Sequence, residues 1–131
     1  MSKCPVPGYS IQNLAEQFNV TPRALRFYES KGLLAPAKRG QTRIYSERDK
    51  TRLLLTLRGK KLGFSLEECR EIIDMYDPSQ SGNTQQLIRL CQKITEHRSA
   101  LLEKMNAVEA TLKLMDEVEK KCLDKLVENS N

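Results

Sequence analysis

The sequence has few of the features that membrane insertion, export or catalysis require. No apolar run approaches the roughly 20 residues of a membrane-spanning helix, and residues 1–20 lack the apolar core of a secretory signal. The sequence also has no phosphate-cradling glycine loop, no nucleophile elbow and no histidine clustered with acids. We therefore expect a cytoplasmic protein that contacts no membrane, is not an enzyme and has no catalytic residues.

Cysteine and histidine are also scarce. The four cysteines form no CxxC pair and are too few for a disulfide scaffold; they are Cys4, Cys69, Cys91 and Cys122. The single histidine, His97, is expected on a helix surface and not as a ligand. We predict reduced thiols, no metal site within one chain and no cofactor.

The 131 residues suffice for about one compact domain and an appendage. Charge is divided unevenly along them. Residues 1–63 carry 13 Lys and Arg against four Asp and Glu, a difference of +9. Residues 64–131 carry nine against 13, a difference of −4. A basic segment joined to a mildly acidic one is typical of a polyanion-binding module attached to another part. The alternative is a basic surface that is merely well solvated.

Two short helices are predicted after an irregular lead-in over residues 1–9. Ser10 can cap the first helix, in which apolar residues recur at helical spacing. Thr21 and Pro22 begin the second helix, which ends at Gly32. Two helices joined by a tight turn form a helix-turn-helix, whose second helix enters a DNA groove.

A short β-hairpin is predicted over residues 34–45, with its turn at Gly40. A hairpin of this length is not stable alone and must lean on the helices, so it forms a wing. Three cations lie on it, namely Lys38, Arg39 and Arg43. They can reach phosphates beside the groove that the recognition helix occupies.

Two more helices complete the predicted head. The third begins after Ser46, and four leucines, among them Leu54 and Leu62, are expected to face the core. A capping box at Ser65 opens the fourth, whose apolar face is expected to include Tyr76. The winged helix-turn-helix domain is thus predicted over residues 10–77, followed by a linker over residues 78–83.

A coiled-coil seam is predicted in the remaining residues, 84–131. From Leu87 to Leu126, twelve positions alternate in steps of four and three; ten are apolar, counting cysteine, and the exceptions are Arg98 and Glu119. This spacing indicates a coiled coil. A straight helix of some 40 residues, about 60 Å long, outreaches the head, so the simplest partner is a second copy of the chain. The alternative is that the stripe packs on its own domain.

Several motifs between residue 9 and about residue 77 have the spacing of a known family. They are residues 21–29, Gly32-Leu33-Leu34, Pro36, Arg43, Tyr45 and Lys60-Lys61-Leu62-Gly63. In these the chain resembles the MerR (mercury-resistance regulator) family. The resemblance implies a mainly α fold, with a winged helix-turn-helix and a long C-terminal dimerisation helix that forms an antiparallel coiled coil. It also implies a homodimer on a near-palindromic site in double-stranded promoter DNA, distortion of that DNA, and RNA polymerase as a further partner.

The run of residues 39–43, together with Cys122, is also similar to a narrower proteobacterial subgroup. That subgroup controls branched-chain amino acid and acyl-CoA catabolism.

Three functions are therefore considered for the chain. The first is a sequence-specific transcriptional regulator. The alternatives are a sequence-independent architectural DNA binder and a coiled-coil adaptor whose basic head binds protein.

Eight residues are DNA-contact candidates on the same resemblance: Thr21, Arg23, Arg26, Tyr28, Arg39, Arg43, Tyr45 and Lys60. Arg23 and Arg26 lie near the start of the recognition helix, where such a helix meets DNA. The resemblance makes Tyr28 and Lys60 phosphate contacts and places Arg39, Arg43 and Tyr45 in the wing. Two alternatives stay open: that Tyr28 is simply core, and that Arg26 pairs with Glu29 or another neighbour instead of reading a base.

Cys91 and Cys122 both lie on the seam. Their residue numbers add to 213, as do those of Leu87 and Leu126 at its ends. In an antiparallel dimer centred on the pattern, Cys91 of one chain would lie near Cys122 of the other. We hypothesise an intersubunit thiol site for oxidation or metal. The alternative is that both cysteines only fill the seam, because cysteine is among the most buried residue types.

Overall fold

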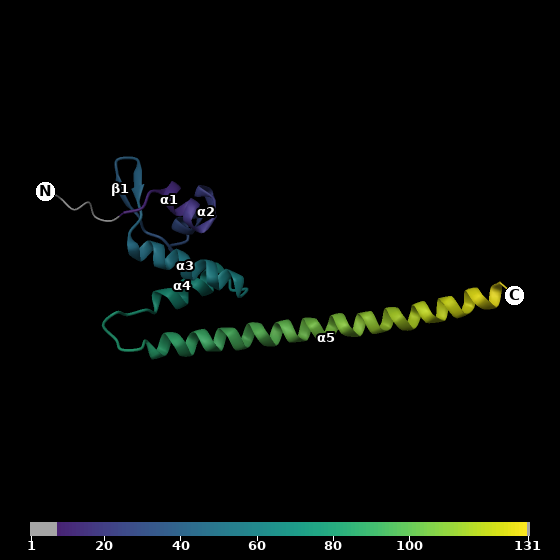
Figure 1. Cartoon of the computed structure of the whole chain (residues 1–131). Helices are drawn as coiled ribbons and strands as arrows, with labels where there is room; N and C mark the ends of the chain where they lie inside the picture. Colours follow the sequence, from purple (N-terminus) through teal and green to yellow (C-terminus); the bar gives the residue numbers. More distant parts are fainter. Residues whose placement is uncertain (1–7, 131) are drawn as a thin grey trace. The chain divides into compact units, whose positions relative to one another are not determined.

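The computed structural model describes residues 8–130, with five helices and one two-stranded sheet (Figure 1). In chain order these are α1 (Ile11–Phe18), α2 (Pro22–Ser30), β1 (Ala37–Arg39), β2 (Thr42–Ile44), α3 (Glu47–Lys61), α4 (Leu66–Asp74) and α5 (Thr84–Asn129). This is the predicted mainly helical fold with a wing and a long C-terminal helix. Cys4 and most of the predicted lead-in, residues 1–9, lie outside the described residues. The chain divides into two compact units, the first ending at Cys91 and the second beginning at Gln92.

Four helices begin where the sequence predicts. The side chains of Ser10, Thr21, Ser46 and Ser65 each accept a hydrogen bond from the backbone N–H three residues later, at 3.0 to 3.1 Å. At the three serines the side chain of that later residue also accepts a hydrogen bond from the cap's own N–H, which completes a capping box. Each cap contributes about 1 kcal/mol, so these starts are fixed by neighbouring residues alone.

The end of α2 needs glycine, as predicted. Gly32 has a φ of +79°, in the left-handed region that L side chains rarely adopt. A Cβ at this position would lie 2.8 Å from the guanidinium carbon of Arg70. The positive φ disfavours any other residue here, whereas the Arg70 side chain could move aside, and the chain turns at Gly32 from the recognition helix toward the wing.

The core of the first unit is small and is drawn from α1, α2, α3, α4 and the segments that connect them. Its largest fully buried side chains are Leu14, Leu25, Leu33, Tyr45, Leu53 and Thr56. The prediction that Leu54 and Leu62 face this core is wrong, because α3 turns its stripe of Asp49, Leu53 and Thr56 inward. Tyr76 is also exposed, contrary to prediction, since α4 ends two residues before it.

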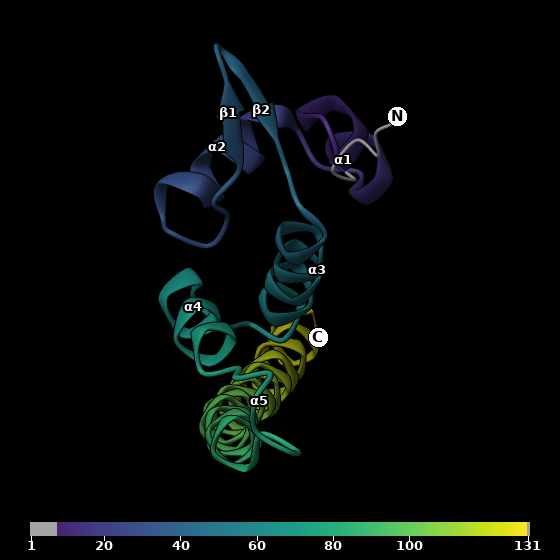
Figure 2. The same ribbon diagram turned by 90° about the vertical axis from the view of Figure 1, so that its left-hand side faces the viewer.

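The wing is an antiparallel pair in which Lys38 stands opposite Arg43. Its turn contains Gly40, whose φ is +63°. At the base of the hairpin, Tyr9 and Tyr45 exchange two backbone hydrogen bonds of 2.8 Å each. Residue 9 was expected in an irregular segment and instead extends the wing. Figure 2 shows the hairpin beside α2.

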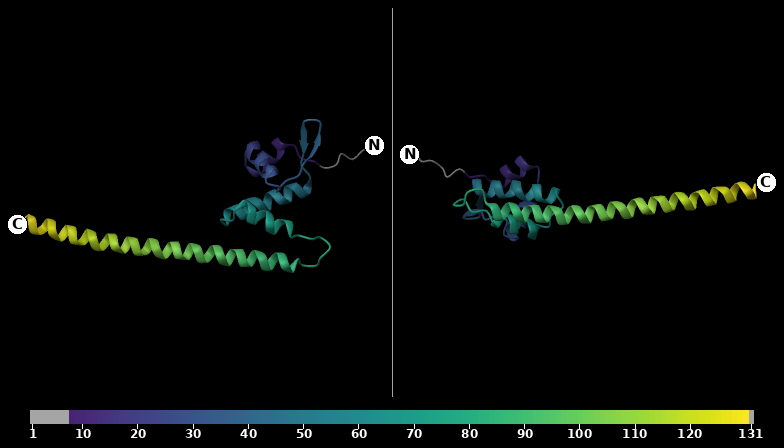
Figure 3. Two further views of the ribbon diagram at one scale, coloured as in Figure 1. Left: turned by 180° about the vertical axis from the view of Figure 1, so that it is seen from behind. Right: turned by 90° about the horizontal axis from the view of Figure 1, so that it is seen from below.

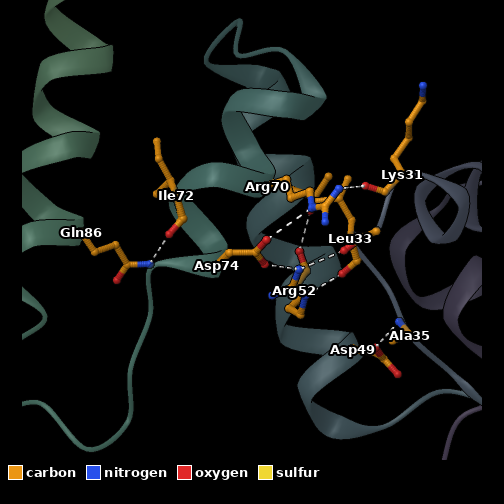
Figure 4. Close-up of polar contacts among 11 residues, drawn as sticks. Lys31, Leu33, Ala35, Asp49, Arg52, Arg70, Ile72, Asp74 and Gln86 are labelled. Carbon is orange, nitrogen blue, oxygen red and sulfur yellow. Dashed lines mark hydrogen bonds and ion pairs between the residues drawn. The ribbon is translucent and has the colours of Figure 1, made fainter.

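Polar side chains of α3 hold the segment that joins α2 to the wing (Figure 4). Asp49, almost fully buried, accepts a hydrogen bond from the backbone N–H of Ala35 at 3.0 Å. Arg52 donates from Nε to the carbonyl of Leu33 at 2.6 Å and forms an ion pair with Asp74 of α4 at 2.8 Å. The segment is therefore fixed from α3, and α4 is joined to the same contact.

Helix α5 runs unbroken from Thr84 to Asn129 (Figure 3). Its first turns pack on α4: Gln86 donates to the carbonyl of Ile72 at 2.8 Å, and Arg89 pairs with Glu71 at 2.8 Å. No residue of α5 is fully buried, and every residue from Arg98 onward is exposed. The apolar seam thus lacks a partner within the described chain. Across residues 8–130, no helix combines the length and apolarity needed to cross a bilayer.

Candidate nucleic-acid interface

Helix α2 and the wing carry most of the predicted DNA contacts. Arg23 and Arg26 of α2 and Arg39 of β1 are exposed and make no ion pair with any residue that the structure describes. Their guanidinium groups are therefore available to a ligand. Thr21 is exposed as well, but its hydroxyl oxygen accepts the hydrogen bond from the N–H of Ala24 that caps α2.

An ion pair ties the wing to the recognition helix. Nε of Arg43, on β2, lies 2.8 Å from Oε1 of Glu29, on α2, and both side chains are about three-quarters buried. Sequence reasoning had instead weighed Glu29 as a partner of Arg26, and in the structure Glu29 binds Arg43. Arg43 therefore also fixes the angle between the hairpin and α2, a role that its wing position alone did not suggest.

Tyr28 and Lys60, both predicted to contact phosphates, lie together. Nζ of Lys60 on α3 donates to the hydroxyl oxygen of Tyr28 on α2 at 3.3 Å, and it lies 5.6 Å from the ring centroid. The ring of Tyr28 is buried, so it is part of the core as the alternative held. Its hydroxyl nevertheless faces a cation, and the pair offers a charge-assisted position for a phosphate oxygen.

Tyr45 differs from its predicted role. Its side chain is fully buried, and its hydroxyl has no hydrogen-bond partner among the described residues. Burial first, and then the negative charge of Glu29, raises the pKa of this phenol above its ordinary value. In this conformation Tyr45 supports the base of the wing from inside and does not reach a phosphate.

Comparison with known proteins agrees with this arrangement. Residues 9–76 match the family described as MerR HTH family regulatory protein, and residues 51–118 match the one described as MerR, DNA binding. The first match alone covers more than half of the chain. The chain belongs to the MerR family. Both descriptions are of DNA-binding regulators and not of enzymes. They agree with the predictions that the chain is a DNA-binding regulator and that it is not an enzyme.

Curated MerR relatives are moderately similar in sequence. The HTH-type transcriptional regulator CueR from Salmonella typhi is 30% identical over 89 residues, which cover 66% of this chain and 64% of the relative. The regulator ZntR from Escherichia coli is 27% identical over 111 residues, which cover 83% of this chain and 79% of the relative. The chain thus spans slightly less than two thirds of the CueR protein.

Solved MerR structures share the fold. A MerR-family transcriptional regulator from Bacillus cereus superposes with a TM-score of 0.64 at 29% identity, covering 87% of this chain and 81% of that one. The regulator PbrR691 from Ralstonia metallidurans, in complex with lead(II), gives a TM-score of 0.63 at 28% identity and covers 81% of each chain. Both matches support the winged head and the long helix.

We predict that Tyr45→Phe leaves DNA affinity within about twofold of the original value. The variant should unfold at the same or a higher temperature, because a buried hydroxyl without a partner costs about 1–3 kcal/mol. Fluorescence anisotropy with a labelled duplex and thermal unfolding test this directly.

Tyr28→Phe is the matched control, since it removes the hydroxyl that faces Lys60 and should weaken binding. Reduced DNA affinity of a Tyr45→Phe protein with unchanged stability would show that the Tyr45 hydroxyl turns outward to the DNA.

Proposed function

We propose that this MerR-family chain is a sequence-specific transcriptional regulator that binds a near-palindromic promoter site as a homodimer and distorts the promoter DNA. RNA polymerase is its expected partner at that promoter. The observation that carries the proposal is the Arg43–Glu29 ion pair, which locks the wing and the recognition helix into one basic surface. Arg23 and Arg26 then supply donors for base edges, while Arg39 supplies one for a phosphate.

Selection of bound duplexes from a random DNA library, with the purified protein at physiological salt, tests this function. A two-fold-related motif is expected, and it would identify the operator. Recovery of unrelated sequences only would favour an architectural binder, since nonspecific binding is largely electrostatic. Recovery of no DNA at all would favour the adaptor and overturn the proposal.

The exposed seam of α5 supports the homodimer, and its two charged positions support antiparallel helices. In a parallel pair in register, Arg98 would face Arg98 and Glu119 would face Glu119 at the seam, an unfavourable pairing of like charges. In the antiparallel register, where paired residue numbers add to 213, Arg98 lies one helical turn from Glu119 of the partner subunit. Neither side chain has an ion-pair partner within the described chain.

We predict that Arg98→Glu weakens the dimer and that adding Glu119→Arg restores it. The single change places like charges together across the seam, and the double change restores opposite charges. Dissociation measured by analytical ultracentrifugation in a double-mutant cycle isolates the coupling. Additive effects of the two changes would rule out the pairing between Arg98 and Glu119.

We further predict that Arg43→Ala weakens binding to all duplexes by a similar factor. The change removes a cation from the DNA-facing surface and leaves Glu29 unpaired beside it. Glu29→Gln is the control, because it breaks the ion pair and keeps the guanidinium. A loss confined to one base position of the selected motif would assign Arg43 to base reading instead.

Cys91 and Cys122 remain a proposed intersubunit thiol site. Both are exposed and reduced in the single chain, whereas Cys69 is buried with a pKa raised by that burial, as suits a structural residue. Within residues 8–130 of one chain, no three His, Cys, Asp or Glu side chains could together hold a metal ion. In the proposed site, a metal would take its thiol ligands from Cys91 of one subunit and Cys122 of the other. The alternative of seam filling stays open.

We expect an intersubunit disulfide between Cys91 and Cys122 after mild oxidation, lost in Cys91→Ser and in Cys122→Ser. Non-reducing electrophoresis and measurement of bound thiophilic metal test the site. Absence of the disulfide, with less than one equivalent of metal per dimer, would leave both cysteines as seam packing.

The target genes remain a proposal from the subgroup similarity of residues 39–43 and Cys122. Arg39 is exposed at the tip of the wing, so this run is accessible to DNA. We propose that the regulated genes serve branched-chain amino acid and acyl-CoA catabolism. The operator from the library selection, located in the genome, tests this assignment independently of DNA binding itself.

A further inference from the structure

Two arginines from different helices converge on the backbone at the C-terminal end of the recognition helix (Figure 4). Arg70 of α4 donates from Nη1 to the carbonyl of Lys31 at 3.3 Å. Arg52 of α3 donates from Nη2 to the carbonyl of Gly32 at 3.3 Å and from Nε to that of Leu33 at 2.6 Å. Three consecutive carbonyls, directly after α2, are therefore held from outside that helix.

Cations suit this position because the carbonyls at the end of a helix carry a partial negative charge. Helix α2 has no basic residue in its own last turn. Lys31 follows the helix, but its ammonium nitrogen lies over the ring of Phe27, 5.4 Å from the centroid. The guanidinium groups of α3 and α4 thus supply the positive charge that the last turn of α2 lacks.

A single carboxylate, that of Asp74 at the end of α4, holds both arginines. Its Oδ1 lies 2.8 Å from Nη2 of Arg52, and its Oδ2 lies 3.3 Å from Nε of Arg70. The side chain of Arg52 is only 12% exposed, so leaving its charge without a counter-charge would be costly, whereas the side chain of Asp74 is 46% exposed. Asp74 therefore fixes two guanidinium groups at once, and through them the backbone that follows α2.

Helix α4 is also attached to the first turns of α5. Gln86 donates to the carbonyl of Ile72, two residues before Asp74, and Arg89 pairs with Glu71. The last turn of α4 is thus bonded on one side to the start of α5 and on the other to the end of the recognition helix.

We propose that Asp74 is a positioning residue for DNA binding, which sets the recognition helix relative to α3 and α4. This role rests on the proposed function, since α2 is the helix that enters the DNA groove. Arg23 and Arg26 project from α2, so a tilt of that helix displaces both guanidinium groups from the bases. Because α4 also binds the start of α5, the same carboxylate couples the recognition helix to the helix that carries the seam of the proposed homodimer.

The alternative role of Asp74 is to add stability alone, and charge separates the two roles. Removing an acid from a protein that binds DNA reduces its repulsion from the phosphates. Asp74→Asn should therefore bind DNA at least as tightly as the original protein if the carboxylate has no positioning role. Weaker binding is expected only if the carboxylate positions α2.

Hydrogen exchange and DNA affinity of Asp74→Asn, made in the full chain, test the proposal. Without DNA, exchange should accelerate about tenfold at the N–H groups of Gly32 and Leu33, which donate to carbonyls in the last turn of α2. Exchange at Leu14 in α1 should not change. In fluorescence anisotropy, the variant should bind the duplex recovered by the library selection about tenfold more weakly, and a random-sequence duplex within about twofold of the original value.

Glu67→Gln is the matched control, because it removes one exposed acid from the first turn of the same helix and leaves both arginines paired. It should bind the selected duplex as tightly as the original protein or more tightly. Asp74→Glu keeps a carboxylate at the position and should recover most of the affinity that Asp74→Asn loses.

Unchanged exchange at Gly32 and Leu33 in Asp74→Asn would overturn the proposal. Accelerated exchange with undiminished affinity for the selected duplex would also overturn it, as would an equal loss on the two duplexes. The exchange measurement contains no DNA, so its outcome is separable from the proposed function. A library selection that recovers no motif would reject the regulator, while the exchange rates still report whether Asp74 positions α2.

Discussion

Two side chains on α3 organise the head of this protein by binding the backbone that joins the recognition helix to the wing. Asp49 holds Ala35 and Arg52 holds Leu33, so two residues of the connection are fixed from one helix. A buried carboxylate and a largely buried guanidinium stabilise a fold only when their hydrogen bonds are complete. The position of the wing thus depends on a polar contact, while the small apolar core supplies the packing around it.

The basic surface depends on this arrangement because its members come from separate elements. The ion pair of Arg43 with Glu29 requires β2 to lie beside α2. The hydrogen bond from Lys60 to Tyr28 requires α3 to lie against α2. Largely buried polar contacts such as these fix geometry more than they add stability. The surface is therefore preorganised for a rigid polyanion, and Arg23, Arg26 and Arg39 keep their donors free.

Local signals made the elements predictable from sequence, and tertiary contacts made parts of the site unpredictable. Ser10, Thr21, Ser46 and Ser65 act on backbone within three residues, so their helix starts could be identified without knowledge of the fold. The pairing of Tyr9 with Tyr45 spans 36 residues, and no local pattern announces it. Leucines occur on several faces of α3, so periodicity could not separate the buried Leu53 from the exposed Leu54 and Leu62. The ion pair of Arg43 with Glu29 was also missed, because it is a tertiary contact between two elements and no local pattern indicates it.

The bare apolar seam of α5 has a consequence for how such a protein responds to its own abundance. In the proposed homodimer, the exposed stripe from Leu87 to Leu126 is covered by the partner helix, so the DNA-binding species is bimolecular. When subunits are scarce, the amount of dimer rises with the square of chain concentration, and so does promoter occupancy. For the proposed regulator, modest changes in synthesis or degradation of the chain would then be amplified at the operator.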